Sequence, residues 1–508
     1  MDFPDAPPHK VDPQWRRAAV AVALLALVLY GSFLCRNVAA VAGASDSSGY
    51  FNHARLLASG HLHMEARTVP GFPPTSAPPK LYMALGFRPA WNGKGLVPTY
   101  PAGLPLLILA AEPLAGWKHA GDLVLVLHSL AGLVVVFALG RRLGLGEPWA
   151  ALGAVVVALS PLYLFMSLVA MSDVPSLVWT TLAILAALRS RERPLWALAA
   201  GAAIALDVLL RPTNILAFIP AAIALGSSPR RWLLFALGGL PGAVFFCAHS
   251  MAAYGSLATT GYGDSTREFS LALVPGALAH YAHWLPLLFT PVVALNLALP
   301  FLGGESARTR WLLATWILAY AAFYSTYRYT QEVWWYLRFL LPAVPAMVVG
   351  GLLVLRALLR RVPRWANPGR SPAAFVVALS LAAAALDHQT KLLHPFSVGA
   401  EERVYSKVTD WMVKNLPPDS ICLTMQASGA LVYSTSFTFV RWDALDSGNV
   451  GKVDAAIRAS GRPLYAVLFP FEVTDQGVLD KKMPGHWTQV GKVEEVTLWR
   501  RDFGSSRN

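Results

Sequence analysis

Charged residues are scarce in this chain. Only 14% of its 508 residues are Asp, Glu, Lys or Arg, where a soluble globular protein carries about 25%. At the same time 55% of the residues are hydrophobic, and apolar runs close to the length of a membrane span recur between residues 18 and 388. This balance excludes an ordinary soluble domain and predicts a polytopic membrane protein.

Cysteine is also scarce. The three cysteines, Cys35, Cys247 and Cys422, lie far apart in the sequence, which excludes the paired spacing of a zinc site and does not indicate a disulfide framework. No small-residue cleavage site follows the first apolar run, so we expect an uncleaved first span and not a removed signal peptide.

Acidic residues are outnumbered, and the formal net charge is +13. In a soluble protein this excess would suggest nucleic acid as a partner. Here the basic residues cluster between apolar runs, so they indicate membrane orientation, and no nucleic-acid partner is expected.

Eleven membrane spans are predicted from the apolar runs. They lie at 18–42, 122–140, 150–169, 174–190, 194–210, 213–226, 232–253, 284–302, 311–327, 338–358 and 372–388. Basic residues occupy alternate connectors: Lys10, Arg16 and Arg17; Arg141 and Arg142; Arg189, Arg191 and Arg193; Arg230 and Arg231; Arg308 and Arg310; and Arg356, Arg360, Arg361, Arg364 and Arg370.

The positive-inside rule puts these connectors in the cytoplasm, together with residues 1–17. The first outer loop, 43–121, and the terminal part, 389–508, then face outside. The stretch YPAGLPLLILAAEPL at 100–114 is short and interrupted by prolines. Because a crossing there would break the alternation, we expect a re-entrant or interfacial piece.

The terminal part differs in pattern from the rest. VYSKVTDWMVKNL has helical spacing, ICLTM and LYAVLF are candidate strands, and TQVGKVEEVTLWRRD is typical of a hairpin. The expected fold class is therefore an all-α membrane domain over 18–388 with a small extracytoplasmic α/β domain over 389–508.

One carboxylate stands just after the first apolar run, in GASDSSGYFNHARLLASGHL at 43–62. Tyr50, Ala54, Leu57 and Ala58 share one stripe of a helix that would begin after Asp46 and end at Gly60. The plain interpretation is that Asp46 or Ser45 caps this helix. Asp46 could cap and also react.

The spacing of Asp46, Tyr50, Ala54, Arg55, Leu57 and Gly60 resembles the first outer loop of GT-C glycosyltransferases. The nearest groups are the protein O-mannosyltransferases and the aminoarabinose transferases of lipid A. Further similar segments follow in order: PTYPAGLPLLIL (98–109), ALSPLYLFMSLVAMSDVPSLVWTTLAILA (158–186), LLRPTN (209–214) and YLRFLLPAVP (336–345). The resemblance covers about 40–350 and implies a GT-C-like membrane fold.

The sequence departs from the family pattern at two places. Ser47 and Ser48 follow Asp46 where many relatives carry a second acid, which weakens the inference of a metal; a divalent ion stays open as a cofactor. Lys94 lies near the proline-rich stretch, but its spacing does not match the lysine of the aminoarabinose enzymes. His53, His61 and His63 are close in sequence, but without a fourth ligand they are best explained as loop residues.

The resemblance implies a sugar donor carried on a polyprenyl phosphate, with its tail in the membrane lipid. Asp46 would be the general base and Asp173 a second catalytic acid that orients the acceptor or tunes Asp46. Substrate-binding candidates are Tyr50, Arg55, Tyr100, Arg211 and Arg338, the arginines because a guanidinium matches phosphate oxygens. For Asp173 a helix cap and for Arg211 a membrane-end residue remain open as alternatives.

The expected activity is transfer of a hexosyl or pentosyl group at the outer leaflet, with inversion. The acceptor could be a protein, a lipid or a glycan. The alanine- and leucine-rich composition with short loops suggests a bacterium, hence its plasma (inner) membrane. Two alternatives remain: a transporter or lipid flippase, against which no repeated halves are found, and a scaffold that has lost activity.

Overall fold

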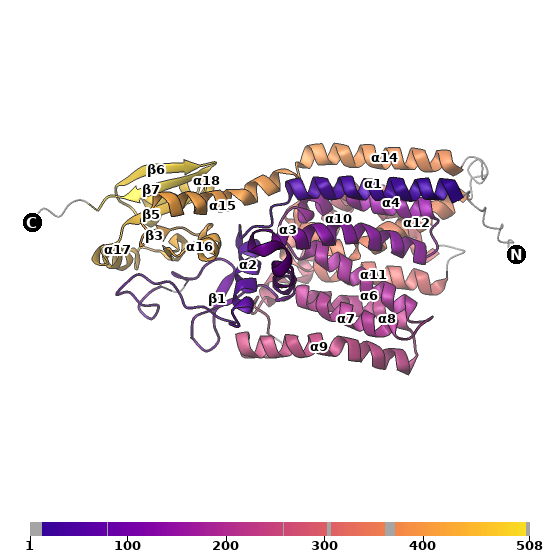
Figure 1. Cartoon of the computed structure of the whole chain (residues 1–508), viewed down its shortest axis with the longest axis horizontal. Coiled ribbons are helices and arrows are strands. Elements are labelled where there is room, and N and C mark those ends of the chain that lie inside the picture. Colours follow the sequence, from indigo (N-terminus) through magenta and orange to yellow (C-terminus); the bar gives the residue numbers. More distant parts are fainter. Residues whose placement is uncertain (1–12, 79, 258, 302–305, 361–370, 504–508) are drawn as a thin grey trace, which may run out of the picture.

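A bundle of helices and a smaller part built on a sheet make up the computed structural model, which describes residues 13–78, 80–257, 259–301, 306–360 and 371–503. Figure 1 shows the sheet at one end of the bundle, with the helix α2 (Ser45–Ala58) at the junction. Lys10, Arg361, Arg364 and Arg370 lie outside the described residues.

The helices of the bundle run along its long axis (Figure 1). They are α1 (Pro13–Asn37), α3 (Gly103–Arg142), α4 (Glu147–Ala158), α5 (Pro161–Ser167), α6 (Asp173–Arg189), α7 (Trp196–Leu210), α8 (Phe218–Leu225), α9 (Pro229–Tyr254), α10 (Val274–Phe289), α11 (Ala307–Ser325), α12 (Val344–Arg360) and α14 (Ser371–Leu393). Shorter 3-10 segments are Pro212–Ala217, Thr266–Glu268, Leu271–Leu273, Pro291–Phe301, Arg328–Gln331 and Trp334–Ala343.

Helix α3 is interrupted at Gly116, whose backbone has φ 65° and ψ 163°. The interruption follows Pro113, which removes a backbone donor from the helix. The proline-rich stretch therefore forms a helical piece of its own that begins at Gly103, and the second piece contains the span predicted at 122–140.

Four helices of the described chain are long and apolar enough to cross a membrane: Gly103–Arg142, Pro229–Tyr254, Leu271–Phe289 and Trp334–Arg360. The pair α4 and α5, bent by 63°, would be a fifth span. Shorter apolar helices occur at Ala21–Asn37, Trp196–Leu210, Pro212–Leu225 and Pro291–Phe301. The count of eleven spans stays a prediction.

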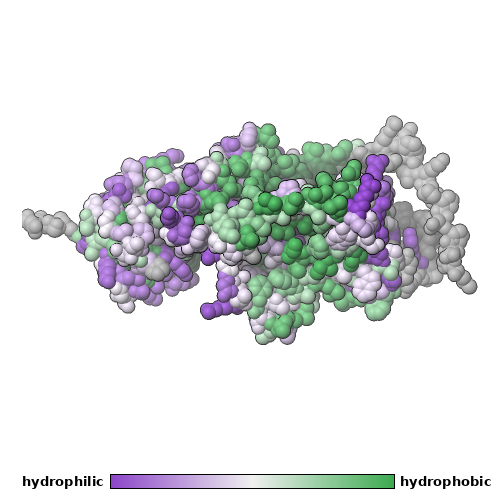
Figure 2. Space-filling model, turned by 90° about the horizontal axis from the view of Figure 1, so that it is seen from below, coloured by the Kyte–Doolittle hydropathy of each residue, from purple (hydrophilic) through white to green (hydrophobic). Residues whose placement is uncertain are grey.

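The surface divides in the same way as the fold. Figure 2 shows hydrophobic residues over the helical bundle and mainly hydrophilic residues over the part that carries the sheet. Arg189 ends α6 and Arg230 begins α9, whereas the opposite ends of these helices, at Asp173 and Tyr254, lie towards α2. The basic ends of α6 and α9, at Arg189 and Arg230, therefore lie at the far end of the bundle from α2.

The sheet has the order β4-β3-β5-β7-β6, with β3 parallel to β4 and β5, and β7 antiparallel to β5 and β6. Its strands are β3 (Ile421–Leu423), β4 (Thr438–Val440), β5 (Leu464–Leu468), β6 (Trp487–Val493) and β7 (Val496–Arg501). The remaining elements are α15 (Ser397–Asn415), α16 (Ser428–Ser434), α17 (Val450–Ala459), α18 (Pro470–Thr474), a 3-10 turn Trp442–Ala444 and a π-helical turn Val478–Lys482. The placement of this α/β part, residues 389–508, on the outer side of the membrane stays a prediction.

The segment between α1 and α3 packs against this sheet. It contains α2 and the hairpin of β1 (Phe87–Pro89) and β2 (Leu96–Pro98). Phe87 and Leu96 share an apolar core with Val408 of α15 and Phe439 of β4. Burial of this shared core stabilises the segment, and so fixes α2 between the two parts.

Candidate functional site

Helix α2 presents Asp46 from its first turn. Its N-cap position is Ala44, and no side chain accepts a hydrogen bond there. The interpretation of Asp46 or Ser45 as a cap is therefore wrong. The carboxylate of Asp46 points instead to the bundle, where Arg338 Nη2 donates to its Oδ2 over 2.9 Å.

The pair of Asp46 and Arg338 is only partly open to solvent, with 24% and 12% of the side chains exposed. Burial raises the pKa of Asp46, but the charge of Arg338 and hydrogen bonds from Tyr100 and Arg338 outweigh it and leave the pKa below its ordinary value. Asp46 is therefore ionised at neutral pH, as a proton acceptor must be.

Tyr100 reaches Asp46 from the start of the proline-rich stretch. Its hydroxyl lies 2.9 Å from Ser45 Oγ and also donates to the Asp46 carboxylate. The ring lies over α2 at Gly49, where an added Cβ would be 2.3 Å from Tyr100 Cδ2. Glycine at this position lets the ring approach the helix backbone.

Asp173 and Arg211 form a second pair beside the first. Arg211 Nη2 lies 2.8 Å from Asp173 Oδ1, and the Asp173 side chain has no exposed surface. Ser172 Oγ accepts from Arg211 Nε (3.3 Å) and from the Tyr50 hydroxyl (3.1 Å). Asp173 makes no capping hydrogen bond in α6, so the cap interpretation is wrong there too.

The two pairs meet. Arg338 Nη1 lies 4.0 Å from Asp173 Oδ2, and the guanidinium groups of Arg338 and Arg211 lie 5.2 Å and 4.9 Å from the ring centroid of Phe339. Arg211 Nη1 and Arg338 Nε are buried and have no hydrogen-bond partner among the described residues. Two always-charged donors are thus available to an anion.

Arg55, a predicted substrate-binding residue, lies apart from this cluster. Its guanidinium stacks over Tyr433 at 3.8 Å and near Trp117 at 5.6 Å, and it donates to the Tyr433 carbonyl. Arg55 therefore joins α2 to α16 and α3. The other predicted site residues lie together in the cluster.

His53 pairs with His249 of α9, their Nε2 atoms 3.2 Å apart. Burial, and then the neighbouring His249, lower the pKa of His53 to about 3, so His53 is neutral. Its Nδ1 lies 3.2 Å from the Tyr100 carbonyl oxygen. Since a carbonyl only accepts, His53 Nδ1–H is the donor and its Nε2 accepts from His249.

No group of three or more His, Cys, Asp or Glu side chains gathers within the described residues. The divalent ion that the sequence left open as a cofactor stays a prediction.

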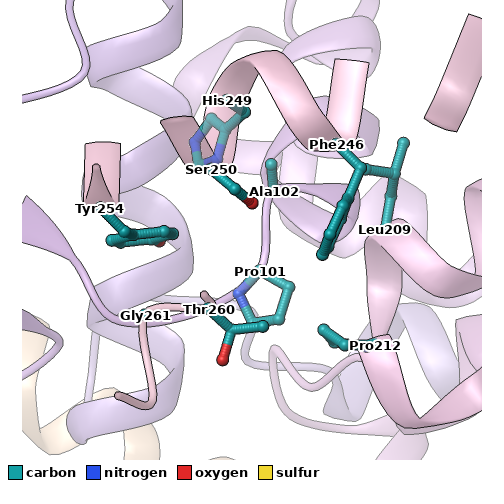
Figure 3. Close-up of a pocket in the computed structure, with 10 residues that line it drawn as sticks. All are labelled: Pro101, Ala102, Leu209, Pro212, Phe246, His249, Ser250, Tyr254, Thr260 and Gly261. Carbon is teal, nitrogen blue, oxygen red and sulfur yellow. The ribbon is translucent and has the colours of Figure 1, made fainter. Parts of the chain in front are cut away.

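A pocket lies between the end of α7, the end of α9 and the residues just before α3. Figure 3 shows its lining, in which His249 and Tyr254 face Pro101, Leu209 and Pro212. It adjoins the backbone next to Tyr100 and Arg211, but the four charged side chains do not line it.

Three contributors were not predicted from the sequence. Ser172, which lies inside the segment 158–186, bridges Tyr50 and Arg211. Phe339, inside YLRFLLPAVP, lies beneath both guanidinium groups. Glu402 of α15 accepts from Ser47 at 3.0 Å; nothing in the sequence pairs residues so far apart.

The family model of dolichyl-phosphate-mannose-protein mannosyltransferases matches residues 117–254. This range contains Asp173 and Arg211 and excludes Asp46 and Arg338. No curated protein sequence matches the chain.

Three solved structures share the fold. The ArnT from Cupriavidus metallidurans bound to undecaprenyl phosphate has a TM-score of 0.58 at 14% identity, over 96% of this chain and 98% of that chain. The Archaeoglobus fulgidus oligosaccharyltransferase has 0.53 at 12% identity, over 89% and 70%. The arabinofuranosyltransferase AftD from Mycobacteria has 0.55 at 14% identity, over 97% and 40%. The chain therefore has the GT-C glycosyltransferase fold, and the resemblance predicted from its ordered motifs is confirmed.

Proposed function

We propose that this chain is an integral-membrane glycosyltransferase that moves a sugar from a polyprenyl phosphate to an acceptor hydroxyl at the outer leaflet. One observation carries the proposal: the guanidinium groups of Arg211 and Arg338 meet at Asp173, next to the partly exposed carboxylate of Asp46. Each keeps one buried N–H that has no hydrogen-bond partner among the described residues. This is the combination that an anionic leaving group and a proton-losing nucleophile require.

The reaction is a single displacement. The acceptor oxygen attacks the anomeric carbon and its proton passes to Asp46. The bond from that carbon to the phosphate oxygen breaks, and the polyprenyl phosphate leaves with the electron pair, held by Arg211 and Arg338. One displacement inverts the anomeric configuration.

Arg338 connects the two halves of this chemistry. In the structure it is paired with Asp46 at 2.9 Å, which keeps that carboxylate a weak base. A phosphate that takes up part of the Arg338 charge raises the pKa of Asp46 and makes it a stronger base while the donor is bound. Donor binding thus prepares the base.

Asp173 acts on Arg211. Its carboxylate is fully buried and lies 2.8 Å from the Arg211 guanidinium. This ion pair holds the Arg211 side chain in the orientation in which its N–H groups can bind the phosphate. Tyr50, through Ser172, and Tyr100, through Asp46, fix the remaining geometry.

The donor lipid is proposed from the similar fold of ArnT, which was solved with undecaprenyl phosphate. The acceptor is a protein, lipid or glycan hydroxyl, and the sugar is a hexose or pentose. The cluster lies at the end of the bundle opposite the basic connectors Arg189 and Arg230. With those connectors in the cytoplasm, α2 and the sheet face outward from a bacterial plasma membrane.

Proteoliposomes that contain the full chain, undecaprenyl phosphate-linked sugars and cell-envelope extract test the proposal. The readout is release of free undecaprenyl phosphate together with labelled glycan. Asp46→Asn should reduce release by about 10²-fold or more, whereas Asp264→Asn, on an exposed aspartate of an outer loop, should not. Full release by Asp46→Asn would remove Asp46 as the base; solute or lipid movement without release would favour a carrier.

A further inference from the structure

Helix α15, in the part that carries the sheet, packs against the chain between α1 and α2 and forms hydrogen bonds with it. Arg403 Nη2 donates to the carbonyl oxygens of Asn37 and Val38 over 3.1 and 2.8 Å. Gly399 lies so close that an added Cβ would be 2.5 Å from the Asn37 carbonyl oxygen. One face of α15 therefore follows the path of the chain that leads to Asp46.

Glu402 lies on the same face and reaches the head of α2. Its Oε2 lies 3.0 Å from Ser47 Oγ, and only 9% of the residue is exposed. An added Cβ on Gly43 would be 1.8 Å from that same oxygen, so the glycine makes room for the carboxyl group. A carboxyl group from a distant helix thus sits next to the residue that follows Asp46.

Two donors hold the Glu402 carboxyl group at the head of α2. The Ser47 hydroxyl donates to its Oε2 at 3.0 Å, and the Ala44 N–H also donates to this group. The Ala44 carbonyl oxygen already accepts from the Ser48 N–H at 2.9 Å, so the Ser47 hydroxyl is free to donate to Glu402.

The surroundings of Glu402 raise its pKa. Burial raises the pKa of Glu402 to about 7, against hydrogen bonds from Ser47 and Ala44 that lower it. The negative charges of Asp46 and Glu401 also raise the pKa of Glu402. Tyr405 lies on the other side, next to Gly43.

We propose that Glu402 is a positioning residue of the transferase site, whose carboxyl group fixes the first turn of α2 through Ser47 and thereby directs Asp46 to Arg338. The inference rests on the proposed function, and it makes the part that carries the sheet a component of the site. Ionisation of Glu402 would place a second negative charge beside Asp46 and repel its carboxylate.

Glutamine is the informative replacement. Its side-chain oxygen accepts from the Ser47 hydroxyl and the Ala44 N–H, as the carboxyl group does, and it never ionises. Alanine removes both bonds and leaves the polar groups of Ser47 and Ala44 without their partner. Gly43→Ala displaces Glu402 without changing it.

The test uses the full chain in lipid nanodiscs, with undecaprenyl phosphate as the probe. The first readout is hydrogen exchange of residues 43–50, corrected for intrinsic rates. Glu402→Ala and Gly43→Ala should lower protection by about 10-fold, and Glu402→Gln and the exposed control Glu401→Ala should not. Equal protection in all four variants would overturn the proposal.

The second readout is affinity for undecaprenyl phosphate between pH 5.5 and 8.5. The ratio of wild-type affinity to Glu402→Gln affinity should fall by about 10-fold as the pH rises through 7, because only the wild type ionises there. The lipid phosphate titrates in both measurements and cancels in the ratio. A ratio independent of pH would show that Glu402 is structural only.

The two proposals can fail separately. A wild-type chain that does not bind undecaprenyl phosphate contradicts the proposed function, while the exchange comparison still decides whether Glu402 orders the head of α2. If Glu402→Ala does not fold, the comparison of Glu402→Gln with the wild type across pH still decides the positioning role.

Discussion

The carboxylate of Asp46 and the guanidinium of Arg338 lie 2.9 Å apart although 292 residues separate them in the chain. The contact joins the first turn of α2 to the 3-10 segment Trp334–Ala343 that precedes α12. Arg338 lies between Asp46 and Asp173, and its charge lowers the pKa of Asp46.

Arg338→Gln should weaken undecaprenyl phosphate binding and change the pH dependence of transfer. Arg338 lowers the pKa of Asp46, so its removal raises that pKa. Because transfer needs ionised Asp46, the acid limb of the rate profile should move to higher pH. Initial rates measured across pH in proteoliposomes check the direction.

The matched control is Arg267→Gln, on an exposed arginine between α9 and α10. It changes the net charge equally and should leave the acid limb in place. An acid limb that stays fixed in Arg338→Gln would contradict the assignment of that limb to Asp46.

Asp173→Asn should destabilise the protein and weaken donor binding through Arg211. The substitution leaves Arg211 buried with an unpaired charge, a change that costs about 3–5 kcal/mol in buried pairs. Thermal unfolding and undecaprenyl phosphate affinity should be measured for Asp173→Asn, Arg211→Gln and the double variant. The two losses should be less than additive; additive losses would mean that the pair does not act as a unit.

Gly49→Ala should disturb Tyr100 without touching a charged residue. The added Cβ would lie 2.3 Å from Tyr100 Cδ2 and 3.1 Å from the Gly86 Cα, so the ring or the backbone must move. Overpacking of this kind costs about 1–3 kcal/mol, and transfer should fall with the displacement of Tyr100.

Gly451→Ala is the comparison, because nothing lies within 4 Å of a Cβ at that helical position. It should leave activity unchanged and keep or slightly raise stability. Equal behaviour of the two variants would show that the ring tolerates displacement.

The candidate site could be predicted to the extent that its residues lie in local patterns. Asp46 follows an apolar run, Asp173 begins an apolar helix, and Arg211 and Arg338 sit at the ends of apolar stretches. Hydropathy and charge locate all four residues, because charged side chains are favoured where an apolar helix leaves the lipid and meets water.

The rest depends on tertiary contacts. In the sequence Glu402 is one acid among others on an amphipathic helix. Only the packing of α15 against Gly43 shows that its carboxyl group lies at the head of α2. Asp207, buried in α7, accepts a hydrogen bond from the Asn214 side chain at 2.7 Å, and this bond stabilises the turn that contains Arg211. In the sequence Asp207 is only an acid within an apolar run, so this role could not be predicted. The Arg55 side chain turns to Tyr433, a partner 378 residues away.

Arg55→Ala should separate the structural from the substrate-binding interpretation of Arg55. The exposed stacking of its guanidinium on Tyr433 at 3.8 Å contributes about 0.5–1 kcal/mol, so thermal unfolding should occur at a slightly lower temperature. Undecaprenyl phosphate affinity should stay at the wild-type value, because Arg211 and Arg338 keep their geometry. Arg55→Lys, which keeps the charge but not the planar stacking, should lose stability as alanine does. If Arg55→Ala lost affinity for undecaprenyl phosphate and Arg55→Lys restored it, Arg55 would be a phosphate-binding residue and the structural interpretation would be wrong.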